Sequence, residues 1–203
     1  PVGPLPIRGA VAKPRPAGMI QFDSHTDLND IYFGTSCYNH GTPFRRAVEK
    51  GLLDPKRYVI IGIRGSAFGR DDWDFAAANG IRIIPIAEFH ARGAEDVMTG
   101  AREVVGAGPV DVTYDIDFVD PTFAPGTGTP EVGGPNSWQA LQVARGLRGL
   151  NVVGADLVEV SPPVDMAGGT ALLGINLIFE MLCGMAERVA RGCPRTPGIF
   201  GPM

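Results

Sequence analysis

Short apolar runs alternate with longer amphipathic stretches along this chain. The apolar runs are residues 17–22, 58–64, 81–86, 110–116 and 152–160. Most are dense in Val and Ile rather than strictly alternating with polar residues, a pattern typical of strands that are buried on both faces. We therefore expect these runs to form strands of a covered sheet.

The stretches between the runs carry helix signals. Residues 42–51 begin with Thr42 as a possible N-cap and Pro43 at the first helical position, and they end at Gly51. Further helices are expected at residues 70–80, 93–108, 137–149 and 170–191. The repeated β-α order predicts an α/β protein with a parallel sheet and helices on both of its faces.

One long segment, residues 117–136, fits neither a strand nor a helix. Irregular segments of this length inside a compact domain are usually functional or disordered. Asp115 and Asp117 stand at its beginning, which favours a functional loop.

Acidic residues gather where the predicted strands end. Asp23, His25 and Asp27 follow the first strand, Arg64 the second, Asp115 and Asp117 the fourth, and Glu159 closes the fifth. Ligands of open parallel sheets bind beyond the carboxyl ends of the strands, so these side chains are expected at one edge. That many carboxylates need a cation to share a partly buried site, and oxygen ligands with an imidazole suit Mn²⁺, Mg²⁺ or Fe²⁺ better than a structural zinc.

Each of these residues also has a plainer interpretation. A lone D-x-H-x-D or D-x-D often caps a helix or lies in a loop, and only the joint placement favours a metal site. His40 precedes a helix and is either a capping or surface residue or a proton shuttle. His90 is expected to be structural or exposed, and Glu131 either supports the metal ligands or is exposed.

Composition narrows the class of protein. The chain has 203 residues, a formal charge of −4 and scattered Lys and Arg, which argues against nucleic acid as the main partner. Three widely spaced cysteines without a C-x-x-C pattern favour free thiols and a cytoplasmic location. The most apolar stretch, residues 170–186, contains Asn176 and Glu180 and is expected to be a buried core helix rather than a membrane span.

Several segments resemble one family, the ureohydrolases, which include arginase and agmatinase. "FDSHTD" resembles the family's D-A-H-x-D metal motif, with Ser24 in place of the alanine. "YDIDFVDPTFAPGTGTPEVGG" and "GADLVEVSPPVDMAGGTALLG" are similar to two further family signatures. "NHGTPFRRAVEKGLLDPKRYVIIGIRGS" resembles the agmatinase branch in particular.

The resemblance implies a three-layer α/β/α fold and a binuclear manganese site. Asp23 and Asp115 would each bridge two Mn²⁺ ions, Asp27 would bind one ion, and His25 and Asp117 would bind the other. Glu159 would face a substrate guanidinium, and His40 would act as proton shuttle or position the substrate. The implied activity is hydrolysis of a guanidino compound, agmatine or similar, to urea and an amine by a homo-oligomer of three or six subunits.

The resemblance also implies that something precedes Pro1. Family members carry a G-G-D/E-H-S motif immediately before a segment like "VGPLPIRGA", and its histidine binds the first ion. We therefore expect residues 1–203 to form a single ureohydrolase-like domain that lacks its N-terminal part. Two alternatives stay open: a truncated, catalytically impaired homologue with an incomplete metal site, and a subunit that folds only inside an oligomer.

Overall fold

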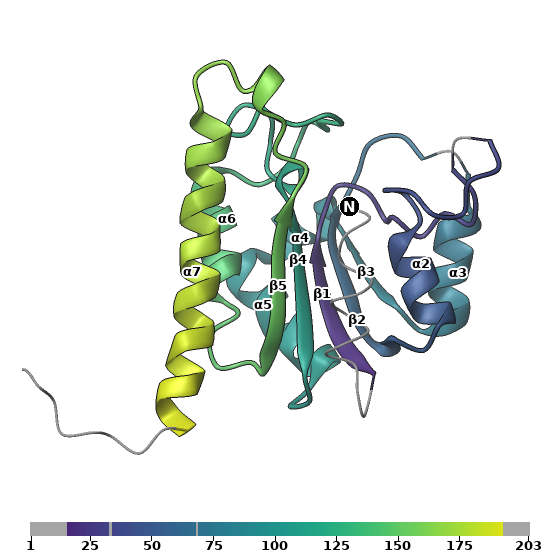
Figure 1. Cartoon of the computed structure of the whole chain (residues 1–203), viewed down its shortest axis with the longest axis horizontal. Coiled ribbons are helices and arrows are strands. Elements are labelled where there is room, and N and C mark those ends of the chain that lie inside the picture. The colour runs from purple at the N-terminus through teal and green to yellow at the C-terminus, as the bar shows by residue number, and fades with distance from the viewer. Residues whose placement is uncertain (1–15, 33, 68, 193–203) are drawn as a thin grey trace, which may run out of the picture.

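The computed structural model describes residues 16–32, 34–67 and 69–192 (Figure 1). Its strands form one five-stranded sheet in the order β3-β2-β1-β4-β5, and every pairing is parallel. The strands are β1 (Ala17–Phe22), β2 (Leu53–Ile63), β3 (Arg82–Pro85), β4 (Val110–Asp115) and β5 (Val152–Val158). The predicted α/β class with a parallel sheet is confirmed.

Helices cover both faces of this sheet. They are α2 (Pro43–Glu49), α3 (Asp71–Asn79), α4 (Ile86–Arg92), α5 (Ala94–Val105), α6 (Ser137–Arg145) and α7 (Gly169–Gly192), with short 3₁₀ turns at Ile116–Phe118 and Pro162–Val164. Figure 1 shows α2 and α3 on one side and α5, α6 and α7 on the other. The result is the three-layer α/β/α arrangement.

Each face of the sheet has its own hydrophobic core, because successive residues of a strand point to opposite sides. Ile20 and Phe22 of β1 pack with residues of α4 to α7. Ala17 and Met19 of the same strand pack with residues of α2 and α3. The strand therefore contributes to both cores, which explains why its residues are all buried.

The order of the strands reverses beside β1. From β1 the chain runs outward through β2 to β3, then returns to place β4 on the other side of β1 and β5 beyond it. Phe22 is level with Ile61 on β2 and with Tyr114 on β4. The three strands thus end together at a switch point, the place where open α/β sheets bind ligands.

Three details differ from the sequence-based expectation. β2 begins at Leu53, well before the apolar run that starts at residue 58. The segment after β3 forms α4, which the sequence pattern did not predict. Thr42 lies at the N-cap position of α2, but its hydroxyl donates to the carbonyl groups of Cys37 and Asn39 instead of capping the helix.

Helix α7 is buried on one side only. Leu177 and Met181 lie in the core, and α7 packs against α6 and β5. Large apolar side chains on its other side are exposed, namely those of Leu172, Ile175, Ile178, Phe179, Leu182 and Val189. The expectation of a buried core helix is therefore only half correct. By length and composition alone, Gly169–Ala190 would be sufficient to cross a membrane, and core helices of soluble proteins pass the same test.

Two expectations extend beyond the described residues. Cys37 and Cys183 are free thiols, as expected, whereas Cys193 lies outside the described part of the chain. The prediction of a single domain lacking an N-terminal part also concerns residues outside it and stays a prediction.

Candidate metal centre

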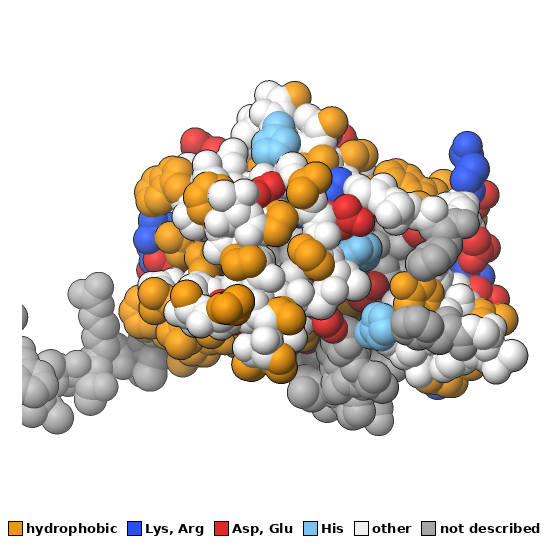
Figure 2. All heavy atoms as spheres, turned by 90° about the horizontal axis from the view of Figure 1, so that it is seen from above, with side chains coloured by type: hydrophobic (Ala, Val, Ile, Leu, Met, Phe, Trp, Pro, Cys, Tyr) orange, Lys and Arg blue, Asp and Glu red, His pale blue; other side chains and the backbone are white. Residues whose placement is uncertain are grey.

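A pocket of about 370 Å³ opens at the carboxyl edge of the sheet, above the switch point between β1 and β4. Figure 2 looks onto this edge, where acidic and histidine side chains surround a hollow. All the predicted site residues line it: Asp23, His25, Asp27, His40, Asp115, Asp117 and Glu159. Residues separated by up to 136 positions are therefore brought to one place, as the strand-end argument predicted.

Asp23 stands at the end of β1 and is almost fully buried. Its backbone N–H donates to the carbonyl of Ile61, continuing the pairing with β2 by one residue (3.0 Å). Its Oδ1 accepts the backbone N–H of His25 (2.7 Å), and its Oδ2 accepts the side-chain amide of Gln21 (2.8 Å). Both oxygens are thus oriented by the chain.

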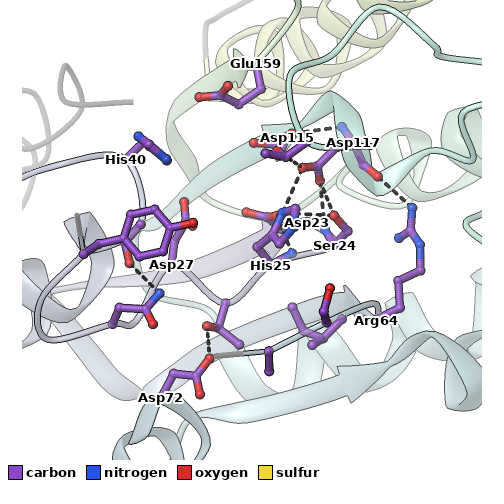
Figure 3. A pocket seen from close by; sticks show the side chains of 18 of the residues that line it. Asp23, Ser24, His25, Asp27, His40, Arg64, Asp72, Asp115, Asp117 and Glu159 are labelled. Atoms are coloured by element: carbon purple, nitrogen blue, oxygen red, sulfur yellow. Dashed lines mark hydrogen bonds and ion pairs between the residues drawn. The ribbon is translucent and has the colours of Figure 1, made fainter. Parts of the chain in front are cut away.

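Asp23, His25 and Asp117 form a compact group of ligand atoms (Figure 3). One ligand atom from each lies within 4.8 Å of the other two. His25 Nδ1 is 2.9 Å from Asp117 Oδ2 and 3.7 Å from Asp23 Oδ1. This spacing suits three ligands of one cation. Asp27 and Asp115 line the same pocket without belonging to this group.

Asp117 is held from both sides. Its Oδ1 accepts the backbone N–H (3.0 Å) and the hydroxyl (2.8 Å) of Ser24. Its Oδ2 faces His25 and also accepts the hydroxyl of Thr129 (3.3 Å), which belongs to the irregular segment after β4. The long loop therefore reaches the centre, in agreement with its functional interpretation.

The electrostatics of the pocket favour bound cations. Burial and the charge of Asp117 raise the pKa of Asp23 to about 6. Burial, together with neighbouring carboxylates, raises the pKa of Asp27 and of Asp115 well above the usual range. Burial opposes a charge on His25, but the Asp117 and Asp23 carboxylates raise its pKa to about 10. Without another cation, bound protons and the His25 imidazolium compensate the negative charge of these carboxylates.

Two residues of the pocket have left-handed backbone geometry that usually requires glycine. Asp27 has φ 52° and Glu159 has φ 63°, and no other non-glycine residue of the described segments has a positive φ. Strained backbone of this kind costs roughly 1–3 kcal/mol and is concentrated at functional sites. The surrounding structure therefore holds both carboxylates in positions that an unstrained chain would not adopt.

His40 and Glu159 lie apart from the compact group, on other elements (Figure 3). Glu159 directly follows β5, and His40 lies in the loop before α2. The ring of His40 meets that of Tyr32 edge-on, with centroids 5.4 Å apart. The Asn39 amide donates to the carbonyls of Tyr32 (3.1 Å) and Ser36 (3.0 Å), which shapes this loop at the mouth of the pocket.

The arginase family model matches residues 4–184 of this chain. The chain belongs to the arginase family. Guanidinopropionase of Pseudomonas aeruginosa is 59% identical over 92% of this chain and 59% of its own length. Mitochondrial agmatinase of Gallus gallus is 50% identical over 88% of this chain and 52% of its own length.

Solved structures agree with this membership. Proclavaminate amidino hydrolase of Streptomyces clavuligerus superposes with a TM-score of 0.84 at 39% identity, over 91% of this chain and 61% of that one. Arginase of Bacillus caldovelox superposes with a TM-score of 0.78 at 25% identity, over 89% of this chain and 64% of that one. The chain spans between half and two thirds of the length of these relatives.

Arg64 anchors the long loop after β4 of this arginase-family chain. Its guanidinium donates to the carbonyl groups of Asp117 (2.7 Å), Glu131 (2.8 Å) and Val132 (3.1 Å), and to that of Gly62. Among the described residues that line the pocket, it is the only Arg or Lys. Glu131 is half-buried beside it, and its carboxylate accepts the backbone N–H of Ser66 (3.4 Å).

Other residues behind the arginase-family site could not be recognised from the sequence. Gln21 is the next-to-last residue of an apolar run and resembles an ordinary polar residue of a strand. Asp72, at the start of α3, accepts a hydrogen bond from the hydroxyl of Thr26 (2.5 Å). Thr26 is the residue between the two ligand candidates His25 and Asp27. Of these supporting contacts, only that between Ser24 and Asp117 had a signal in the sequence, because the family motif has alanine at this position.

Proposed function

We propose that this chain belongs to a binuclear manganese amidinohydrolase, which hydrolyses a guanidino compound to urea and an amine. The observation that carries the proposal is the group formed by the half-buried His25 with the buried Asp23 and Asp117, with Asp27 and Asp115 lining the same pocket. Carboxylate oxygens with one imidazole fit Mn²⁺ in the hardness of the ligands. The raised pKa values of the buried carboxylates indicate that a bound cation would be stabilised there.

The proposed roles follow from the position of each side chain. Asp23 and Asp115, at the ends of adjacent strands, would each contact both ions. Asp27 would bind one ion, whereas His25 and Asp117, which already lie 2.9 Å apart, would bind the other. Two bound Mn²⁺ ions lower the pKa of water and thereby supply hydroxide near neutral pH, which the poorly electrophilic guanidinium carbon requires.

The walls of the pocket would bind and orient the guanidinium. Its described lining contains six Asp or Glu residues and one Arg, so the pocket would attract a planar cation to the edge of the sheet. We assign the substrate contact to Glu159, which lines the same pocket and whose left-handed backbone fixes its position there. The departing amine requires a proton, and Asp117 or His40 would deliver one that it first accepts from the attacking water.

The pocket residues say less about the group at the end of the substrate opposite the guanidinium. A guanidino acid would bring a carboxylate, and Arg64, the one cationic side chain other than histidine among the described lining residues, is already bound to backbone carbonyls. Neutral groups such as those of Tyr32 and Asn29 line the same pocket. Agmatine and short guanidino acids are therefore the substrates to compare, the latter because guanidinopropionase is 59% identical to this chain.

Urea release tests the proposed activity. The protein is loaded with Mn²⁺ and assayed with agmatine, 3-guanidinopropionate, 4-guanidinobutyrate and arginine. Urea from at least one of them is expected. If none yields urea although Mn²⁺ binds, the impaired homologue with an incomplete site is the better description.

Metal analysis tests the bridging role separately. Asp115→Ala is expected to abolish binding of both ions, because the lost carboxylate contacts each of them. Asp111→Ala is the matched control, since Asp111 is as buried as Asp115 but lies at the far end of the same strand. Retention of both ions in Asp115→Ala would contradict the bridging assignment.

Assembly and location remain proposals. We propose a homo-oligomer of three or six subunits in the cytoplasm, with no membrane or nucleic-acid partner. The relatives from Gallus gallus and Homo sapiens are named as mitochondrial, whereas the names of the Pseudomonas aeruginosa proteins give no compartment. Sedimentation of the Mn²⁺-loaded protein measures the number of subunits directly.

A further inference from the structure

Gln21 is a polar side chain in an apolar layer. It lies on the face of β1 that Ala17 and Met19 contribute to the core under α2 and α3, and it is completely buried. It does not line the pocket. A primary amide in such a place is costly unless its donors and its acceptor are all hydrogen-bonded.

The Gln21 amide satisfies this requirement by joining the core to the metal centre. Its NH₂ group donates to Asp23 Oδ2 (2.8 Å) and to the backbone carbonyls of His25 and Thr26 (both 3.3 Å). Its Oε1 accepts the hydroxyl of Tyr58, a fully buried residue of β2. One side chain thus contacts a candidate ligand and the backbone of the loop that carries two others.

The contact with Asp23 leaves that carboxylate able to bind a cation. Each carboxylate oxygen has two lone pairs, and the chain occupies one on each oxygen through the His25 N–H and the Gln21 amide. The remaining lone pairs are available at the pocket. The two donors therefore fix the plane of the carboxylate without blocking it.

The acceptors of the loop determine which way the Gln21 amide points. With the hydroxyl as donor, Oε1 faces Tyr58 and the NH₂ group faces the loop. A flipped amide would place Oε1 against the Asp23 carboxylate and two backbone carbonyls, where like partial charges repel. The observed orientation is therefore the stable one even if the tyrosine hydroxyl is removed.

We propose that Gln21 is a positioning residue of the manganese centre, acting through Asp23 and through the backbone of residues 25–26. The inference rests on the proposed function, because it concerns ions that bind at Asp23. Partners of metal ligands orient them, and their removal typically weakens metal affinity by about 10- to 100-fold. Since Asp23 is assigned to both ions, both should be affected.

The test compares three variants: Gln21→Leu, Tyr58→Phe and the double variant. Each is titrated with Mn²⁺ by calorimetry, and the thermal midpoint of each metal-free protein is measured. In Gln21→Leu the amide is lost from both Asp23 and the Tyr58 hydroxyl, so both metal affinity and stability should fall. In the double variant both partners of the Gln21–Tyr58 hydrogen bond are replaced by apolar groups, so part of the lost stability should return.

Metal affinity separates positioning from a merely structural role. We expect the Kd for Mn²⁺ to rise about 10- to 100-fold in Gln21→Leu and to stay raised in the double variant, because Asp23 lacks its donor in both. Tyr58→Phe, which keeps the contact with Asp23, should lower the thermal midpoint but change Kd by no more than about twofold.

Two results would overturn the inference. Affinity that recovers with stability in the double variant would show that Gln21 serves only the core. An unchanged Kd in Gln21→Leu would show that Asp23 needs no such partner. If the unaltered chain takes up no Mn²⁺ at all, the proposed metal centre itself is wrong, and the inference is wrong with it.

Discussion

Two residues of this site have strained backbone conformations that their residue types do not predict. Asp27 and Glu159 lie in the left-handed region, which side chains with a Cβ avoid. Asp27 is the last residue of the D-x-H-x-D segment, and its left-handed conformation changes the direction of the chain there. Glu159 has the same conformation directly after the end of β5. The placement of both carboxylates thus depends on tertiary contacts rather than on local preference.

Glu159→Gly and Glu159→Ala both delete the carboxylate but differ in backbone freedom. Glycine adopts a positive φ without steric cost, so Glu159→Gly should be more stable than Glu159→Ala by about 0.5–1 kcal/mol. Urea unfolding of the two variants measures the difference. Ala77→Gly, at an exposed helical position of α3, should instead destabilise the protein by about 1 kcal/mol. If glycine were less stable than alanine at position 159, as it is expected to be at position 77, Glu159 would not be strained.

Proton release should accompany metal binding, because His25 has a pKa raised to about 10 and Asp23 one raised to about 6 in the metal-free protein. Mn²⁺ binds the neutral imidazole and the ionised carboxylate. Apparent affinity should therefore increase as pH rises through about 6 and continue to increase toward about 10. Calorimetry in two buffers with different heats of ionisation counts the protons released. An affinity independent of pH across this range would contradict the coupling.

At the scale of elements, the irregular segment after β4 is fixed by an anchor from β2. Arg64 donates to the carbonyls of Asp117, Glu131 and Val132, so one planar guanidinium joins both ends of the loop. Its donors form a rigid fork, whereas lysine presents a single ammonium group.

Arg64→Lys should therefore loosen the loop while leaving the sheet intact. We expect the backbone amides of residues 117–134 to exchange hydrogen faster, and stability to fall by about 1–3 kcal/mol as the charged hydrogen bonds are lost. Hydrogen exchange followed by mass spectrometry resolves the segment. Arg70→Lys is the control, because the Arg70 side chain is 88% exposed and makes only a loose ion pair. Unchanged exchange in Arg64→Lys would show that other contacts order the loop.

Sequence patterns predicted the strands and most helices because burial on both faces leaves dense Val and Ile runs. They placed the site as well, since Asp23 and Asp117 follow strands whose ends had to meet at one edge. They missed the early start of β2 at Leu53, where polar residues and Pro55 hide a strand. They could not find the Gln21 and Arg64 contacts, which depend on the register between β1, β2 and β4.

At the scale of the whole molecule, helix α7 has exposed apolar side chains and packs against β5, the last strand of the sheet. β5 pairs only with β4 among the described strands, and its residues are mostly half-buried. Figure 1 shows α7 running beside β5, and exposed Leu, Ile and Phe side chains belong to this helix. Large exposed apolar patches mark protein contacts or sites of self-association, and we expect such a role for this face of α7.

Charged substitutions on α7 should distinguish this surface from the core. Ile175→Lys and Leu182→Lys replace exposed side chains, so stability should change by no more than about 0.5 kcal/mol while concentration-dependent association decreases. Leu177→Lys, on the buried side of the same helix, should unfold the protein. Light scattering and thermal unfolding report the two effects. Undiminished association in both exposed variants would place the contact elsewhere.

The pairing of β1 with β4 also determines when the metal centre can exist. Ser24 and Asp117 are 93 residues apart, so their hydrogen bonds form only after the chain has closed that large loop. Closure of long loops delays parallel sheets during folding. A cation that needs both halves of the site therefore cannot guide early folding and would bind mainly to the finished structure. It would slow unfolding far more than it accelerates refolding, and a metal-loaded chain would persist mainly because it opens rarely.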